Sequence, residues 1–370
     1  MKKNAFFWYW VFALFIITYI NYPSALLPRD YKNFGYLFMG LGSLIFFGLE
    51  IPKKYLFFYS PIILLAFINQ HHLWAKSPFI ECLFFAVGFC NLFQFYQLMD
   101  RDKFYKMVGI MCLIQCAWIW VNWLGYDPHT VITGQKMVEI KTGSTNFIQP
   151  VIGSLGHWMV SGTFLLLSTP FLFSFHPILL LIPIITSVVL PSAIFPVGLA
   201  LFLVVFCYIK LPIKYKKVVN ILACLSPLIL LMRIELPEIL YPGERFKLWR
   251  VSIINLKFNW VWGSGLGYFK DFFHPIFGNK FFESHAHPHN EFIKIFISFG
   301  IIGLGVTLNL YRILLRGFKL DPIAGASLLV SIVPMMVGFP LHTASTWLVM
   351  AISIASMLKQ LDNGLTGEKI

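Results

Sequence analysis

Residues 289–303, HNEFIKIFISFGIIG, begin a long apolar segment with an imidazole and an amide side chain. The segment continues to about residue 311, and a helix of about 20 residues crosses a hydrocarbon core about 30 Å thick. It therefore predicts a membrane-spanning helix over 290–311. His289 then lies at the mouth of that helix, where an ionisable group is positioned for chemistry at a membrane surface.

The rest of the chain has the composition of a multi-pass membrane protein. Of its 370 residues 58% are hydrophobic and 12% are charged, and the mean hydropathy is +0.74. A soluble domain carries roughly twice that share of charge. Because helices satisfy their own backbone hydrogen bonds in lipid, we predict an all-α helical bundle with one transmembrane domain over 1–370. The expected spans, about twelve, are 6–22, 34–50, 55–70, 78–98, 104–124, 151–173, 177–191, 193–209, 218–234, 290–311, 322–340 and 344–359.

Positive charge predicts the orientation, since short cytoplasmic loops retain Lys and Arg. The first span lacks a small-residue cleavage site, so we interpret it as a retained helix with its N-terminus inside. Sixteen of the 29 basic residues then lie on the inner side: Lys2, Lys3, Lys53, Lys54, Arg101, Lys103, Lys106, Lys210, Lys214, Lys216, Lys217, Arg312, Arg316, Lys319, Lys359 and Lys369.

Two longer segments, 125–150 and 235–289, are expected on the outer side. The second is too long for a simple connection, and long structured loops are usually functional. It is also basic, which indicates an anionic ligand. Nucleic acid is a poor candidate, because the charge faces away from the cytoplasm and no nucleic-acid motif accompanies it. Within this loop, 244–260 has the pattern of an amphipathic helix on the membrane interface.

Three stretches in this region resemble the signature of the O-antigen ligase and polymerase superfamily. They are 243–249 (GERFKLW), 263–269 (GSGLGYF), and His289-Asn290 followed by Gly300 and Gly303. The resemblance implies a bacterial inner-membrane glycosyltransferase of lipopolysaccharide biosynthesis, with its active site facing the periplasm. Such an enzyme transfers a glycan from undecaprenyl diphosphate to an acceptor hydroxyl, without a metal or another cofactor. Its partners are the lipid-linked donor, a glycan, lipid A–core or protein acceptor, and membrane lipid.

The resemblance also implies roles for individual residues. His289 matches the general base, and imidazole titrates near working pH. Arg245 matches a contact to the diphosphate, which a guanidinium can grip at two oxygens. The family's second cation has no counterpart at Ser192-Ala193, and Arg233 or Arg250 could replace it. The predicted supporting residues are Glu283, His287 and Asn290.

Simpler interpretations stand beside these. Arg245 and Arg250 could anchor an interfacial helix, Gly300 and Gly303 could admit another backbone, and the glycines of 263–269 could form only a sharp loop. The alternation of Glu283, His285, His287 and His289 could hold a metal, but Pro288 interrupts it and the resembled family needs none. The six cysteines indicate no disulfide framework or metal site. Polar residues within the spans should face the bundle interior: Glu81, Asn91, Gln94 and Gln115.

Ligase activity towards a lipid A–core sugar is the favoured function. A polymerase that joins polysaccharide repeat units is the next, followed by a protein O-glycosylase. The alternative outside enzymes is a transporter or flippase of lipid-linked sugars, which would need polar pathway residues deep in several spans.

Overall fold

A computed structural model of the protein describes fifteen parts of the chain: 1–19, 28–53, 55, 76–126, 128, 154–155, 158–190, 192, 194–210, 249–250, 253–254, 259–265, 290–337, 341 and 343–366. In these parts all regular structure is helical. The helices are α1 (Lys2–Tyr19), α2 (Pro28–Phe47), α4 (Lys76–Leu98), α5 (Arg101–Trp123), α7 (Trp158–Ser168), η1 (Thr169–Ser174), η2 (Pro177–Leu180), α8 (Leu181–Val189), α9 (Ile194–Lys210), α15 (Glu291–Gly317), α16 (Pro322–Val330), α17 (Ile332–Val337) and α18 (Ala344–Thr366).

The observed helices follow the apolar segments of the sequence. Three described segments are long and apolar enough to cross a membrane: Arg101–Trp123, Glu291–Arg312 and Ala344–Asn363. The other apolar helices are shorter, and 322–340 is divided into α16 and α17 at Ser331. The expected spans 55–70 and 218–234 lie outside the described residues, apart from Tyr55, so the full number of spans stays a prediction.

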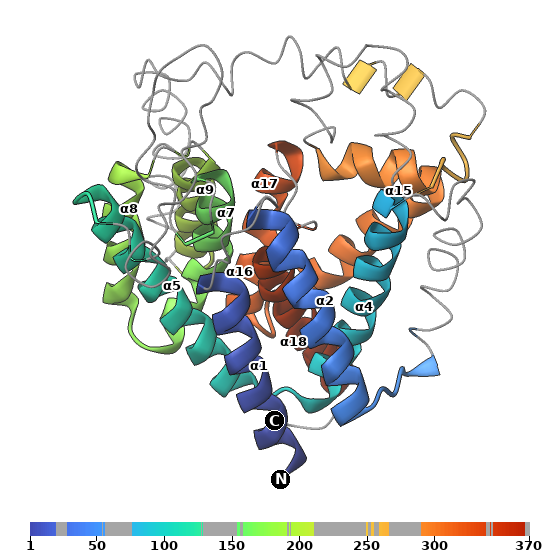
Figure 1. The fold of residues 1–370 in the computed structure, drawn as a ribbon, viewed down its shortest axis with the longest axis horizontal. Helices are drawn as coiled ribbons and strands as arrows, with labels where there is room; N and C mark the ends of the chain where they lie inside the picture. The colour runs from blue at the N-terminus through green and yellow to red at the C-terminus, as the bar shows by residue number, and fades with distance from the viewer. Residues whose placement is uncertain are drawn as a thin grey trace.

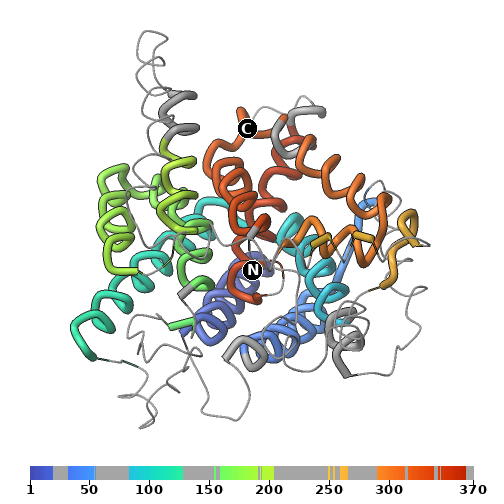
Figure 2. The backbone as a smooth tube through the Cα atoms, turned by 90° about the horizontal axis from the view of Figure 1, so that it is seen from above, coloured from blue at the N-terminus to red at the C-terminus, as the bar shows by residue number. Residues whose placement is uncertain are grey.

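Helix α18 forms the centre of the bundle and contacts α4, α7, α15 and α16. In its apolar window 83% of the residues are buried, against 33% for α15, which lies at the periphery. Figure 1 shows α18 among the other helices, and Figure 2 shows α7, α8 and α9 on the opposite side of the C-terminal helices from α15.

Large apolar side chains cover the outside of the bundle. On α2 they recur at helical spacing, with Phe34, Phe38 and Ile45 all at least 47% exposed. On α1, Trp8 and Phe12 are more than 60% exposed. Soluble monomers rarely expose contiguous apolar surface on this scale, whereas such surface is favourable against lipid. The exterior and the three long apolar helices together indicate a membrane protein.

Polar side chains inside the bundle join neighbouring helices. Asn91, Gln94 and Gln115 are fully buried, as expected for polar groups within spans. The Gln94 amide donates to the carbonyl oxygens of Ser43 (3.0 Å) and Gly48 (2.6 Å), which ties α4 to α2. Gln115 pairs with Ser154 and Ser161. The side chain of Glu81 lies outside the described residues.

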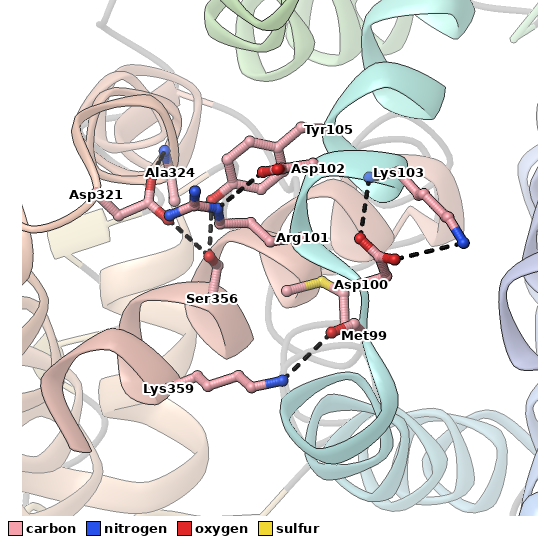
Figure 3. A network of polar contacts seen from close by, with 10 residues as sticks. All are labelled: Met99, Asp100, Arg101, Asp102, Lys103, Tyr105, Asp321, Ala324, Ser356 and Lys359. Atoms are coloured by element: carbon pink, nitrogen blue, oxygen red, sulfur yellow. Dashed lines mark hydrogen bonds and ion pairs between the residues drawn. The ribbon is translucent and has the colours of Figure 1, made fainter. Parts of the chain in front are cut away.

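Both chain termini lie at the same end of the bundle (Figure 1), and a group of polar contacts closes that end (Figure 3). The carboxylate of Asp321 is 2% exposed and accepts hydrogen bonds from Tyr105 Oη (2.5 Å), Ser356 Oγ (2.7 Å) and the backbone N–H of Ala324 (3.2 Å). It thus caps α16 and holds α5 against α18.

Several of the predicted inner cations gather at this same end. Lys103 Nζ donates to Asn4 Oδ1 (2.8 Å), and Lys359 Nζ donates to the Met99 carbonyl (3.3 Å). Arg101 lies beside Asp102 (Figure 3). These three predicted inner cations therefore lie at one physical end of the bundle. That this end faces the cytoplasm stays a prediction.

Candidate functional site

Helix α15 begins at Glu291, and Asp321 lies just beyond its C-terminal end. Polar residues at the start of α15 attach this helix to α17 and to the segment before α18. Asn290 Oδ1 accepts from the backbone N–H of Ile293 (3.0 Å), which caps the first turn of the helix. Its amide group donates to the Met336 carbonyl on α17 (3.0 Å). Next to it, Glu291 accepts from the backbone N–H of Leu341, ahead of α18, at 3.0 Å. These bonds fix the position of Asn290 and of the first turn of α15.

A glycine then breaks α15. Gly300 has φ +64° and ψ −161°, a backbone conformation available to glycine and strained for every other residue. Figure 1 shows that α15 changes direction along its length. The expected span 290–311 is thus divided into two helical pieces, of which the first is 291–299.

The turn at 260–265 docks on this break. Ser264 N–H donates to the Ile297 carbonyl (2.7 Å) and Gly265 N–H to the Ser298 carbonyl (3.0 Å). In return, Ile301 N–H donates to the Trp260 carbonyl (2.9 Å). Breaking a helix frees such groups, and buried backbone groups must find partners elsewhere. The turn supplies these partners.

The two backbones approach so closely that side chains are excluded. A Cβ on Gly300 would lie 2.1 Å from the Val261 carbonyl oxygen, and one on Gly263 would lie 2.4 Å from the backbone of Ser298 and Phe299. The expectation that Gly300 admits another backbone is therefore confirmed, although the partner is a loop. A Cβ on Gly303 would instead meet the side chain of Phe299 in its own helix.

A cavity of about 190 Å³ lies against both pieces of α15, between α4, α15, α16, α17 and α18. Its walls are mostly apolar, including Phe85, Phe89 and Leu310. Two buried charged residues of α15 also line it: Glu291, which is 1% exposed, and Lys294, which is 5% exposed. Such a space suits an amphiphile, with the apolar part against the aromatic walls and the polar part near Glu291 and Lys294.

Two of the predicted site residues lie within the described parts of the chain. Asn290 is buried at the mouth of α15, as described above. Arg250 is exposed and does not line the cavity. Its neighbours Ile253 and Ile254 are 50% and 44% exposed. The interfacial helix expected over 244–260 stays a prediction. The remaining predicted site residues lie outside the described residues: Arg233, Arg245, Glu283, His287 and His289.

Sequence reasoning did not single out Glu291 and Lys294. The signal was available, because two charged residues inside a predicted span are costly in lipid and mark functional or buried positions. Both lie in the first turn of the helix that Asn290 caps.

No family model matches the chain, and no curated protein matches it in sequence. The resemblance to the ligase and polymerase superfamily therefore depends on the quoted residues alone.

Proposed function

We propose that the protein is an inner-membrane glycosyltransferase that moves a glycan from undecaprenyl diphosphate to an acceptor hydroxyl on the periplasmic side. One observation carries the proposal: the turn at 260–265 docks on the Gly300 break of α15. Two motif elements about 35 residues apart thereby form one unit, beside Asn290 and a cavity suited to an amphiphile. Glycines that serve only to form a loop would not need to lie against a helix break.

The proposed reaction is a direct displacement at the anomeric carbon of the donor sugar. The acceptor oxygen forms a bond to that carbon while the bond to the diphosphate oxygen breaks. His289 takes the proton of the acceptor hydroxyl, and Arg245 stabilises the charge that develops on the diphosphate. The anomeric configuration is inverted, because no covalent enzyme intermediate forms. A lipid A–core sugar is the proposed acceptor, with a second repeat unit as the alternative.

The test is glycan transfer by purified protein in detergent, with donor and acceptor supplied and a chelator present. His289→Ala should lower the rate by about 100-fold or more, the scale of a lost general base. The control is His176→Asn. His176 is exposed and its ring caps η2, and an asparagine side chain can form the same cap. Full activity of His289→Ala would exclude the mechanism.

The same assay examines Arg245. Arg245→Lys should lose most of the activity, because an ammonium cannot reproduce a two-pronged contact to phosphate. Near wild-type transfer by both Arg245→Lys and Arg245→Ala would leave this residue with an anchoring role only. The acceptor that is consumed, core sugar or repeat unit, separates ligase from polymerase.

A further inference from the structure

The turn at 260–265 carries two exposed tryptophans. Trp260 is 52% exposed and Trp262 is 56% exposed, although the backbone of the turn is held against α15. Tryptophan combines a large apolar ring with one N–H donor, and it is enriched where a membrane meets water. The environment that these two rings require therefore indicates where the turn lies relative to a bilayer.

The turn adjoins a surface of α15 that suits lipid. Ile301 begins the second helical piece of α15 and is 48% exposed. Leu308, seven positions later on the same helix face, is 54% exposed. The backbone N–H of Ile301 donates to the Trp260 carbonyl (2.9 Å). The exposed apolar surface of the helix thus meets the turn at Ile301 and Trp260.

The length of the second piece of α15 gives the depth of the turn. Arg312 and Arg316 are exposed near the C-terminal end of this piece. From Ile301 to Arg316 the helix rises about 1.5 Å per residue, about 22 Å in all when it stands upright and less when it tilts. The hydrocarbon core is about 30 Å thick, and an arginine side chain can reach its edge from a few ångströms inside. With the arginines at one edge, Ile301 and Trp260 lie at or just inside the other edge.

Irregular backbone at this depth needs hydrogen-bond partners, because lipid supplies none. Ser264 and Gly265 donate their backbone N–H groups to α15, as described above. Gly263 N–H donates to the Asn259 carbonyl (2.6 Å), and the Asn259 amide donates to Ser264 Oγ (3.5 Å). The turn and the broken helix thus supply partners to each other. Non-helical backbone is tolerated at membrane depth when protein groups pair it in this way.

We infer that the turn at 260–265 inserts into the leaflet opposite Arg316, the outer leaflet in the predicted topology, with the rings of Trp260 and Trp262 against phospholipid at the boundary of the hydrocarbon core. The close approach of Gly263 to the backbone of Ser298 and Phe299 holds the turn at this depth. The partner of this surface is the bilayer itself. The inference concerns membrane position, and it holds whatever reaction the protein performs.

The test attaches a fluorescent label to single cysteines and compares how lipid and water-borne probes quench it. The protein, with its six native cysteines replaced, is reconstituted in bilayers of phosphatidylethanolamine and phosphatidylglycerol. Lipids that carry a nitroxide near the headgroup or near the end of the acyl chain report depth, and iodide reports contact with water. Labels at Trp260→Cys and Trp262→Cys should be quenched most by the shallow nitroxide. Iodide should quench them several-fold less than a label at Asp102→Cys.

Control positions calibrate the label. Leu308→Cys, on the exposed apolar face of α15, should be quenched most by the deep nitroxide. Asp102→Cys should be quenched by iodide, because the side chain of Asp102 is 75% exposed at the polar end of the bundle. Where a tryptophan variant does not fold, as judged by its thermal unfolding, Asn259→Cys carries the label instead, because Asn259 is exposed and directly precedes the turn.

Three results would overturn the inference. Iodide quenching at Trp260→Cys and Trp262→Cys equal to that at Asp102→Cys would place the turn in water. Protection from iodide and from both nitroxides would show a protein contact, such as a second copy of the chain. Quenching by the deep nitroxide as strong as at Leu308→Cys would place the turn inside the core and away from its boundary. Each of these results leaves the transferase proposal intact, because the readout does not involve glycan transfer.

The break in α15 allows a second measurement. With the label at Trp262→Cys, Gly300→Ala should raise quenching by iodide and lower quenching by the shallow nitroxide, because the turn loses its place on α15. Gly305→Ala is the matched control and should change neither, since no atom lies within 4 Å of its added Cβ. Equal quenching in Gly300→Ala and Gly305→Ala would overturn the role of α15 in setting the depth of the turn.

Discussion

Replacing Gly300 with alanine should release the turn at 260–265 from α15. The backbone at Gly300 lies in a region that costs other residues about 1–3 kcal/mol. The new Cβ would also lie 2.1 Å from the Val261 carbonyl oxygen and 2.7 Å from the Gly263 nitrogen. Since both neighbours are backbone atoms, no side chain can rotate away, and the turn itself must move.

The magnitude follows from what that movement breaks. Three backbone hydrogen bonds join the turn to α15, and each contributes about 0.5–1.5 kcal/mol net. Strain and lost bonds together give a destabilisation of about 2.5–7.5 kcal/mol. With an unfolding entropy of about 2 cal/mol/K per residue, Tm should fall by about 3–10 °C.

The assay is thermal unfolding of purified variants in one detergent. Gly305→Ala is the matched control, because it lies on the same helix with no atom within 4 Å of the added Cβ. It should be neutral or slightly stabilising. Gly125→Ala isolates the strain, since Gly125 has φ +89° and open space around it; it should cost about 1–2 kcal/mol. If Gly300→Ala had the same Tm as Gly305→Ala, the docking of the turn on α15 would be refuted.

Three further outcomes are expected. Asp321→Asn should lower the unfolding free energy by about 1.5–3 kcal/mol in denaturation experiments, because bonds to a charged acceptor are lost. Asp102→Asn is the control and should be nearly neutral, because the side chain of Asp102 is 75% exposed. Equal effects of the two variants would contradict the role of Asp321 in holding α5 against α18. Asn290→Ala should cost about 1 kcal/mol as a lost helix cap, seen as a lower Tm, and should slow transfer because His289 precedes it; an unchanged Tm would rule out the cap. Reporter fusions should be active in the periplasm at residue 260 and inactive there at residue 214, and the reverse pattern would overturn the topology.

Local pattern made much of the helical structure predictable. The expected spans 104–124 and 344–359 correspond closely to α5 and α18, because a long apolar run in lipid must pair its own backbone groups. The same reasoning correctly put Gln94 and Gln115 in the interior. It did not predict the division of 322–340 at Ser331, since a break in a helix depends on what packs around it.

The candidate site was predictable only in part. The sequence pointed to Asn290 at a helix mouth and to glycines that admit another backbone. It gave no reason to expect Lys294 at the wall of a cavity and Lys32 between helices, because both are lysines within apolar helices. Their surroundings differ: Lys32 lies among α1, α2 and the 154–155 turn, and Lys294 lines the cavity beside α15.

The sequence by itself determined that this protein is helical and suited to a membrane, because composition and apolar run length act locally and need no partner. Only the tertiary structure decided where α15 breaks. Any of the 26 glycines can adopt a positive φ. Gly300 adopts it because the turn at 260–265 supplies hydrogen-bond partners for the groups that the break exposes, and those partners lie about 35 residues away in the chain.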